Sequence, residues 1–436
     1  MAEVTWGLLG PEALAGERRT RTLGLGAVVR LFNDRAVPGL GGVWFGKQAF
    51  LATLGVAVAE KLRMSGRRVR NIEVANAIEA LACWLALSSN EWTRDPRLRG
   101  ATKMIGKSDL SYAAVRSPSF YVTVPMRQST VQPLRALGLV EGTGERFNAF
   151  HCSQHGSDFI EAVCEGLRPH KREVVEHLAL WAAGSHDDVT NSWPLRQALS
   201  PLEPIAPRAR EFFRERIVQG AGEAARRRQA LAWVERLRAK PNSGGSWEQK
   251  PDVLEDAHWS DLRAGALFFA TRDAALAVLD AVEAHIANSS GLRVRLDDQL
   301  PKSVSRAINS LRRHARAFVD NKHDPSAGFA ATVFSRECTE PNEIRLIERL
   351  FARDGRVLRQ RDRHIVPGVA FRGLQTDQSD SQNAPEQAGA EGAVTDVIPL
   401  PENISSRVRN LFLLNLDMRD ELDDWLVAPA ADEDAS

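Results

Sequence analysis

Apolar residues recur at helical spacing along most of this chain. In residues 47–65 they fall at intervals of three and four, and residues 71–88 carry a similar stripe that begins beside the capping residue Asn71. Gly66 stands between these stretches, so we expect two helices that pack as an antiparallel pair. The same spacing predicts helices over residues 174–182, 208–240, 262–286, 304–318 and 340–351. The chain is therefore predicted to be mainly α-helical.

A short polar-faced helix is predicted near the start of the segment 124–166. Ser129 and Gln132 form a capping-box pattern, which places the first turn of a helix near Thr130, and Gly138 ends it. Pro133 lacks the amide hydrogen that a helix interior needs. Unless Pro133 lies in the first turn, we expect this helix to be kinked or short.

A β-hairpin and a closing helix are predicted next. Residues 139–141 form an apolar strand, a glycine turn follows, and residues 146–152 alternate polar and apolar side chains as a second strand. Ser157 or Asp158 then caps an amphipathic helix. Together with the helix over residues 71–88, this order resembles a winged helix-turn-helix in residues 70–166, similar to the modules of MarR-like transcription regulators.

The resemblance implies contact with double-stranded DNA. A helix that enters a major groove presents short polar, Arg and Gln side chains to base edges and phosphates, and a wing presents a basic tip. The candidate DNA-binding residues are Arg127, Gln128, Ser129, Thr130, Gln132, Arg135 and, on the wing, Arg146. Winged helices also serve as protein–protein modules, as in the kleisin subunits of chromosome-organising complexes, so both kinds of partner stay open.

Composition divides the rest of the chain. Residues 1–46 form an N-terminal segment, and residues 47–168 hold the helical pair and the winged helix. The flexible stretch PNSGGS, residues 241–246, separates a helical segment over 169–240 from a helical domain over 247–370. A linker over residues 375–398 is acidic, lacks large apolar side chains and is expected to be disordered.

The stretch over residues 400–428 is unusually apolar for a tail. A tethered apolar segment beyond a linker is a common plan for binding a partner, so we expect this stretch to dock on the body of this chain or on a partner chain. The side chains expected to carry the docking are Leu411, Leu414, Leu422 and Trp425.

Charge is unevenly distributed along the chain. The net charge is +1, but residues 375–436 hold 14 acidic and 3 basic side chains, which leaves the body basic. A basic body suits a polyanionic partner, and the acidic tail either competes for that surface or is simply solvated. The run Arg226, Arg227 and Arg228 is expected to be exposed and supplies possible phosphate contacts.

Motifs that carry chemistry are sparse. Residues 41–47 read G-x-x-x-x-G-K, but Gln48 stands where a P-loop has Ser or Thr, and no buried strand precedes it. The four cysteines lack the spacing of a disulfide framework or a zinc ribbon. His151, Cys152, His155 and Cys164 crowd one region but fit better as ordinary side chains of a strand and a helix. No cofactor, metal site or catalytic residue is predicted.

Three hypotheses of function follow. Without an apolar run of the ~20 residues that span a bilayer, and without a signal peptide, the chain is expected to be cytoplasmic, and its excess of Arg over Lys indicates a bacterial genome. The first hypothesis is a non-enzymatic DNA-binding protein within a larger DNA-handling assembly, whose partners are protein subunits or a second copy of itself. The second is a kleisin-like scaffold of a chromosome-organising or DNA-defence complex. The third is a nucleotide-using enzyme.

Overall fold

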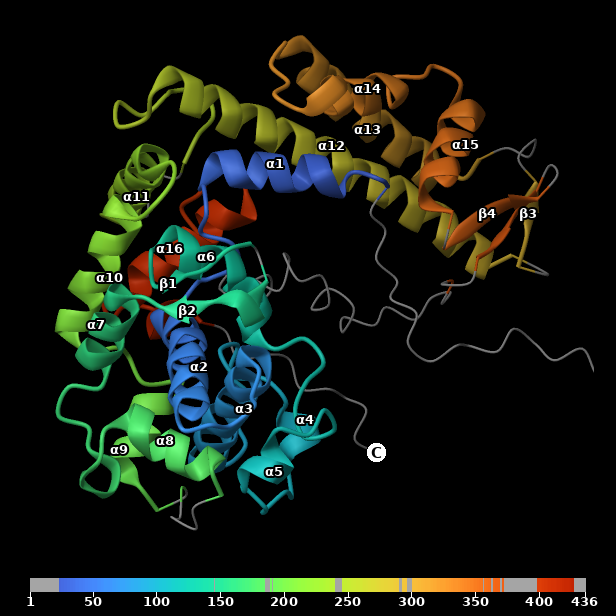
Figure 1. The fold of residues 1–436 in the computed structure, drawn as a ribbon. Helices are drawn as coiled ribbons and strands as arrows, with labels where there is room; N and C mark the ends of the chain where they lie inside the picture. The colour runs from blue at the N-terminus through green and yellow to red at the C-terminus, as the bar shows by residue number, and fades with distance from the viewer. Residues whose placement is uncertain are drawn as a thin grey trace, which may run out of the picture. The chain divides into compact units, whose positions relative to one another are not determined.

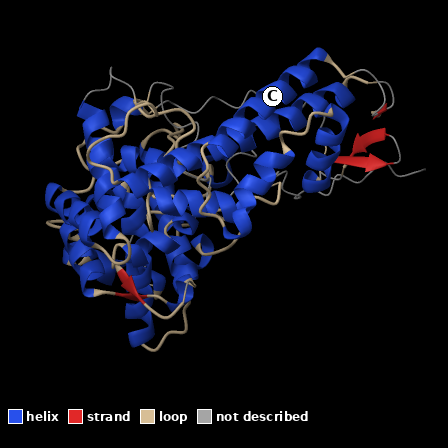
Figure 2. Cartoon of the chain, turned by 90° about the horizontal axis from the view of Figure 1, so that it is seen from above, coloured by secondary structure: helices blue, strands red, loops and turns tan. Residues whose placement is uncertain are grey.

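The computed structural model is mainly helical (Figure 2), with two small sheets in the part of the chain that it describes, and this confirms the coarse fold class expected from the sequence. It describes residues 23–426 apart from several gaps. These gaps are residues 145, 185–188, 190, 240–244, 290–291, 296–299, 356, 362–363, 369–370 and 372–397. The expected acidic linker falls almost entirely outside the described residues, as does most of the PNSGGS stretch.

The chain folds into two compact units. Unit 1 combines residues up to Phe32 with residues 260–383, and unit 2 combines residues 33–259 with the C-terminal part of the chain. The division falls within α1 (Gly26–Ala36) and within α12 (Asp256–Ala287). Each unit is therefore built from segments that are far apart in the sequence.

The centre of unit 2 is the antiparallel pair α2 (Gly46–Met64) and α3 (Asn71–Ser89), drawn in blue in Figure 1. The two helices approach closely at Gly55, where an added Cβ would lie 2.4 Å from the Cβ of Ala75. By length and composition, α3 is the one helix in the described part of the chain that could cross a membrane. Most of it is buried against its neighbours, as in a core helix of a soluble protein.

Shorter elements surround this pair. Figure 1 shows α7, α10 and α11 following one side of unit 2, and α16 packs against α11. Their bounds are α4 (Ala101–Met104), α5 (Tyr112–Val115), η1 (Met126–Ser129), α6 (Val131–Ala136), β1 (Val140–Glu141), η2 (Phe147–Ala149), β2 (His151–Cys152), α7 (Gln154–Val163), η3 (Pro169–Lys171), α8 (Val174–Ala182), α9 (Trp193–Leu199), α10 (Pro207–Gln219), α11 (Ala224–Ala239), α16 (Ser406–Asp417) and η7 (Asp423–Trp425).

The segment expected to be a winged helix differs from its predicted form. Helix α6 is six residues long, and Pro133 lies in its first turn, so the proline does not kink it. The sheet β1–β2 has only two residue pairs, Val140 with Cys152 and Glu141 with His151. The expected strand over 146–152 is wrong in its first half, which forms the 3₁₀ turn η2. The closing helix α7 is capped by Ser153, whose hydroxyl accepts from the Gly156 amide, and not by Ser157 or Asp158.

The single long helix expected over residues 208–240 is also wrong. The chain forms α10 and α11 instead, and the break lies at residues 220–223. At Gly220 an added Cβ would lie 2.4 Å from the Ala136 carbonyl oxygen, so the close approach of α6 requires a glycine here.

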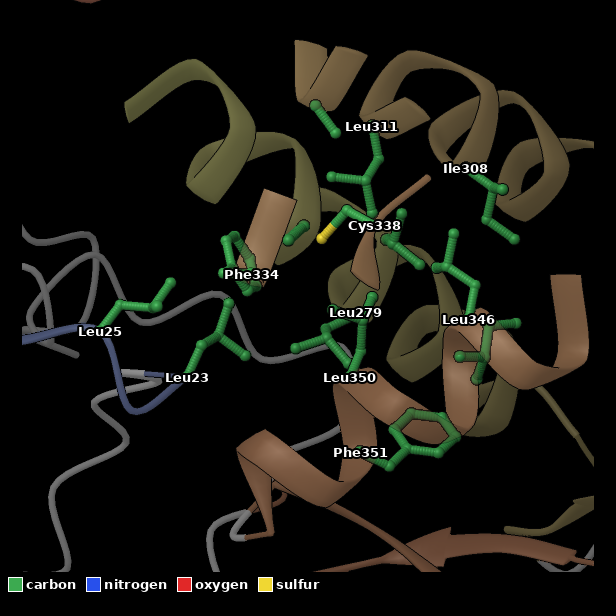
Figure 3. Close-up of a cluster of buried hydrophobic side chains, with 14 of the residues drawn as sticks. Leu23, Leu25, Leu279, Ile308, Leu311, Phe334, Cys338, Leu346, Leu350 and Phe351 are labelled. Carbon is green, nitrogen blue, oxygen red and sulfur yellow. The ribbon is translucent and has the colours of Figure 1, made fainter. Parts of the chain in front are cut away.

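Unit 1 is a helical layer with a small sheet at one end. Its apolar core (Figure 3) combines Leu23 and Leu25 with side chains of α12, α13, α14 and α15. The sheet has the antiparallel order β3–β5–β4, and Ile365 of β5 pairs with Val294 on one side and Gln360 on the other. The bounds are β3 (Val294–Arg295), α13 (Lys302–Asp320), η5 (Ala327–Phe329), α14 (Ala330–Glu337), α15 (Glu343–Asp354), β4 (Leu358–Arg361) and β5 (His364–Pro367).

Candidate nucleic-acid interface

The turn between α2 and α3 carries a dense group of arginines. Gly66 adopts a positive φ of 84°, which ends α2, and its amide donates to the Arg63 carbonyl at 2.9 Å. The next amide, of Arg67, donates to the Leu62 carbonyl at 3.0 Å. This closure turns the chain sharply, so that the residues RRVR protrude between the two helices.

An open pocket of about 530 Å³ lies at this turn. Its lining includes four arginines, Arg63, Arg67, Arg68 and Arg70, against a single acid, Glu73. The Arg63 guanidinium is held inward by Asn71 Oδ1 at 2.7 Å, whereas Arg67, Arg68 and Arg70 are exposed. Pockets with such an excess of guanidinium groups suit phosphate or carboxylate ligands, because arginine forms forked contacts with both.

Asn71 fastens the hairpin segment to this end of α3. Its Nδ2 atom donates to the carbonyls of Phe147 at 3.0 Å and Phe150 at 2.7 Å, and the Ile72 amide donates to Asn148 Oδ1 at 3.0 Å. Arg146 directly precedes these residues and is exposed. The basic tip of the hairpin therefore belongs to the same end of the helical pair as the RRVR turn.

A third segment adds Arg116, which forms an ion pair with Glu73. Glu73 also faces Arg70 at 3.9 Å, so one acid is shared between two arginines. In the described part of the chain, neither the Arg68 side chain nor the Arg146 side chain has a hydrogen bond or an ion pair. We name the exposed group Arg67, Arg68, Arg70, Arg116 and Arg146 the arginine surface.

The residues expected to read a DNA groove are dispersed. Arg127, Ser129 and Thr130 are buried, Gln128 is half-buried, and Gln132 and Arg135 are exposed on α6. The Arg127 guanidinium lies 5.0 Å from the centre of the Phe147 ring and donates to Asn76 Oδ1 at 2.7 Å. Ser129 and Thr130 bond the carbonyls of Met126 and Arg127 within their own turn. The three buried side chains therefore stabilise η1 and present no groove-facing surface in this structure.

A buried carboxylate explains this inward position. Glu79 of α3 accepts from the amides of Met126 at 2.6 Å and Arg127 at 2.9 Å, and from the Tyr121 hydroxyl at 2.9 Å. Burial raises the pKa of Glu79, and these hydrogen bonds oppose that shift by favouring its charged form. Glu79 thus fixes η1 against α3, and burial similarly lowers the pKa of Arg127.

The glycine-rich loop before α2 covers a flank of α6. Gly41 has a positive φ of 55°, and a Cβ there would lie 2.8 Å from both Pro133 Cδ and the Ser129 carbonyl oxygen. At Gly42 a Cβ would lie 2.8 Å from Ser129 Cβ. Gln132, beside this loop, donates to Asp34 at 2.8 Å. These glycines therefore serve close packing between chain segments.

The resemblance of residues 41–47 to a phosphate-binding loop has a structural explanation. The Lys47 ammonium points inward and donates to the carbonyls of Gln197 at 2.8 Å and Ala198 at 2.6 Å, at the end of α9. The Gly46 amide donates to Asp417 of α16 at 2.8 Å. Burial lowers the pKa of Lys47 to about 8 and raises that of Asp417 to about 6. The amide and the ammonium that a nucleotide would need thus bind groups of this chain.

The arginine run of α11 is split by burial. Arg227 is only 1% exposed and donates to four carbonyls: Ile217, Pro38, Gly220 and Ala221. Arg226 is half-buried, donates to the Arg35 carbonyl and pairs with Glu223. Arg228 is exposed. The expectation that all three are exposed is wrong for Arg227, because its guanidinium binds one carbonyl of the last turn of α10 and two carbonyls that directly follow the helix, and Arg226 is only partly exposed.

The C-terminal stretch docks within unit 2. Leu411, Leu414 and Leu422 are buried there, and the half-buried Trp425 meets the Phe412 ring edge-on at 5.3 Å between ring centres. This is one of the two positions expected from the sequence, namely the body of the same chain. A partner would reach these leucines only after α16 had left the core.

The cysteine and histidine cluster near the hairpin is dispersed. His151 Nδ1 lies 3.0 Å from Glu60 Oε1, and the Cys152 amide donates to the same oxygen at 3.1 Å. Burial raises the pKa of Cys164 to about 12. The described residues hold no group of three His, Cys, Asp or Glu side chains placed to bind one metal ion.

The sequence reasoning did not single out the RRVR turn, which is the most basic part of the candidate interface. A signal was present, because Arg63, Arg67, Arg68 and Arg70 fall within eight residues on either side of the helix-ending Gly66. Asn71 was expected to cap α3, and this is wrong, because Arg70 holds the N-cap position and Asn71 is the first residue of the helix. The Asn71 side chain instead bonds the carbonyls of Phe147 and Phe150, which lie 76 and 79 positions away and which no local sequence pattern indicates.

Comparisons with known proteins add no further assignment. No protein-family model matches this chain, and neither a search of curated proteins nor a search of solved structures finds a match.

Proposed function

We propose that this protein binds duplex DNA, without a catalytic step, through phosphate contacts made by the arginine surface. The observation that supports the proposal most directly is the set of three exposed arginines, Arg67, Arg68 and Arg70, that line one open pocket. Arg116 joins them through its ion pair with Glu73, and Arg146 precedes the residues that Asn71 fastens to the same end of α3. Only Glu73 opposes them in the lining of that pocket. The affinity for DNA then comes mainly from contacts with the phosphate backbone and not from contacts of α6 with base edges.

The physical basis is the release of counterions. Each arginine that neutralises a phosphate releases a condensed cation, so that affinity falls steeply as salt rises. Exposed guanidinium groups with few partners lose little when they change to phosphate contacts. Arg146 then acts as the tip of a reduced wing, and Gln132 and Arg135 of α6 are the remaining exposed members of the expected groove-facing set.

The test is a salt titration of DNA binding by the full chain and by the triple variant Arg67→Gln/Arg68→Gln/Arg70→Gln. The slope of log affinity against log salt should become shallower by about 2 to 3, since each lost phosphate contact contributes about 0.9. A matched triple variant, Arg168→Gln/Arg208→Gln/Arg236→Gln, removes three exposed arginines of unit 2 outside the arginine surface. The control should keep the wild-type slope, and an equal slope in both variants would refute the proposal.

A scaffold role is the second candidate, and the burial of η1 favours it over base reading. Arg127, Ser129 and Thr130 contact their own chain, so the module already works as a packing element. The same titration separates the two roles. A wild-type protein without measurable affinity for duplex DNA at about 50 mM salt, where phosphate contacts are strong, would favour the scaffold.

A further inference from the structure

Helix α13 of unit 1 carries a second basic surface. The helix is 19 residues long, and its exposed side chains include Lys302, Arg306, Arg313 and Arg316. These four positions follow one another at intervals of four, seven and three, so they lie along one side of the helix. The first acid in the helix is Asp320, its last residue. We name these four side chains the α13 stripe.

The opposite side of α13 fixes the direction of this stripe. Val304, Ile308, Leu311, Ala315 and Phe318 are fully buried, and Figure 3 shows Ile308 and Leu311 within the apolar cluster of unit 1. Phe318 meets Phe268 of α12 at 5.9 Å between ring centres. The helix cannot turn its basic side chains inward without exposing these apolar residues, so the α13 stripe faces solvent.

Neighbouring acids are already engaged elsewhere. Glu343 accepts from the Ser305 hydroxyl at 3.1 Å and lies 4.0 Å from Arg312, which is not part of the stripe, and Glu340 pairs with Arg349 at 2.9 Å. Among the described residues, the Arg313 guanidinium donates only to the hydroxyl of Ser310, at 3.2 Å. Across the described residues, the side chains of Lys302, Arg306 and Arg316 have no hydrogen bond or ion pair.

We propose that the α13 stripe is a second DNA-backbone surface, so that one chain holds two duplex segments at once and acts as a DNA bridge. This inference rests on the proposed function for its first contact, at the arginine surface. From Lys302 to Arg316 the helix rises about 21 Å, at 1.5 Å per residue. A duplex segment of that length carries roughly 12 phosphate charges, which is enough for each of the four basic side chains of the stripe to contact a phosphate.

The chemistry of the surface favours nucleic acid over a lipid membrane. A helix that binds a membrane surface inserts its apolar face between lipids while its bases meet the headgroups. The apolar face of α13 is instead buried in the core of unit 1. Asn309 and Ser303, which are exposed beside the bases, are polar residues able to bond phosphate oxygens.

The experiment is a two-duplex capture assay with the full chain. One duplex is fixed to a bead, the protein is bound, and capture of a second, labelled duplex is measured. The quadruple variant Lys302→Gln/Arg306→Gln/Arg313→Gln/Arg316→Gln should still bind the fixed duplex but lose at least about tenfold in capture, as the salt dependence of four lost contacts predicts. A matched quadruple variant, Arg263→Gln/Arg336→Gln/Arg345→Gln/Arg349→Gln, removes four exposed bases of unit 1 outside α13 and should capture normally.

The outcomes separate the two proposals. Capture that survives in the α13 variant would overturn the bridge, because a second copy of the protein then holds the second duplex. The bridge would also be overturned if the wild-type protein bound anionic phospholipid vesicles, the α13 variant lost this binding, and capture of the second duplex stayed unchanged. Failure of the proposed function appears differently, as an unchanged salt slope in the Arg67/Arg68/Arg70 variant. Thermal melting by circular dichroism should match in all variants, since the changed side chains are exposed.

Discussion

Two arginine runs in unit 2 have the same composition and opposite environments. Arg67, Arg68 and Arg70 follow the end of α2 and extend into solvent around an open pocket. Arg227, in the first turns of α11, is enclosed and bonded to carbonyls at the end of α10. Charge alone therefore does not decide whether an arginine run can bind a ligand.

The difference lies in what each run faces. A helix C-terminus leaves its last carbonyls without intrahelical partners, and a cation beside them is stabilised by the helix dipole. Arg227 occupies that position relative to α10, and burial together with Arg216 lowers its pKa. At the α2 terminus, the amides of Gly66 and Arg67 satisfy carbonyls through the turn itself, so no guanidinium group is needed there. The side chains of Arg67, Arg68 and Arg70 therefore stay exposed, although Arg67 donates to the Ala183 carbonyl at 2.7 Å.

The largest effect is expected for Arg227→Met. Loss of the guanidinium leaves four carbonyl contacts unmade in a buried site, which should lower the free energy of unfolding by about 3–5 kcal/mol. Urea denaturation followed by tryptophan fluorescence measures this change. The neighbouring substitution Arg228→Met, at an exposed position, should change stability by less than about 0.5 kcal/mol. Equal destabilisation by the two substitutions would erase the distinction between buried and exposed arginines within this run.

A second prediction concerns pH and the buried Asp417. Burial raises its pKa from 3.8 to about 6 in the folded protein, against the attraction of the Gly46 amide, Arg97, Arg210 and Lys47. Because the folded state binds a proton more tightly than the unfolded state, stability should fall as pH rises from about 4 to about 6, by up to about 3 kcal/mol. Above pH 7 this contribution should be constant.

The variant Asp417→Asn should lack this pH dependence while its amide oxygen still accepts from Gly46. Urea denaturation at pH 4, 5, 6 and 7 gives the difference in stability between variant and wild type at each pH. The control is Asp420→Asn, an exposed carboxylate paired with Arg210, for which we expect less than about 1 kcal/mol. A difference for Asp417→Asn that does not change between pH 4 and 6 would contradict the prediction.

The smallest effect is expected for Glu73→Gln. Glu73 neutralises Arg70 and Arg116 beside the pocket, so its removal should raise DNA affinity two- to fivefold at low salt. Glu73 also lies in the first turn of α3, where a negative charge interacts favourably with the helix dipole. Its removal should therefore lower the free energy of unfolding by about 0.3–1 kcal/mol. Fluorescence anisotropy with a labelled duplex measures the affinity. Weaker binding after this substitution would indicate that Glu73 is part of the ligand-binding arrangement and does not merely compete with it.

Sequence periodicity predicted α13, because this helix buries one apolar face against its neighbours. It also predicted α2, although that helix is buried on nearly all sides. It failed over residues 146–152. There Phe147 and Phe150 are both buried at a spacing of three, which is not the alternation of a strand. Their carbonyls accept from the Asn71 side chain and not from a neighbouring strand. The break between α10 and α11 was foreseeable from Gly220 and Gly222, whose spacing is typical of a helix end.

The candidate site was only partly predictable for the same kind of reason. Arg146 lies exposed at the hairpin, as its position near a glycine turn indicates. The burial of Arg127 depends on Glu79, Asn76 and Phe147, which come from two other elements. The environment that buries Arg127 is formed by tertiary packing, so the local sequence pattern does not indicate it. The sequence likewise predicted that the segment of α16 docks on an apolar surface, either of this chain or of a partner. Which of the two it covers depends on tertiary packing and not on the pattern within the segment.

The contact between Gly46 and Asp417 has a consequence for synthesis of the protein. Residues 371 positions apart meet in the core of unit 2, so that core stays incomplete until the ribosome has made the chain as far as Asp417. Unit 1, whose core is complete by Ile365, can form earlier. Until α16 emerges, the apolar surface that it later covers on α11 stays open to chaperones and to other nascent chains. A ribosome that stalls before residue 406 would thus release a chain with one finished unit and one open core.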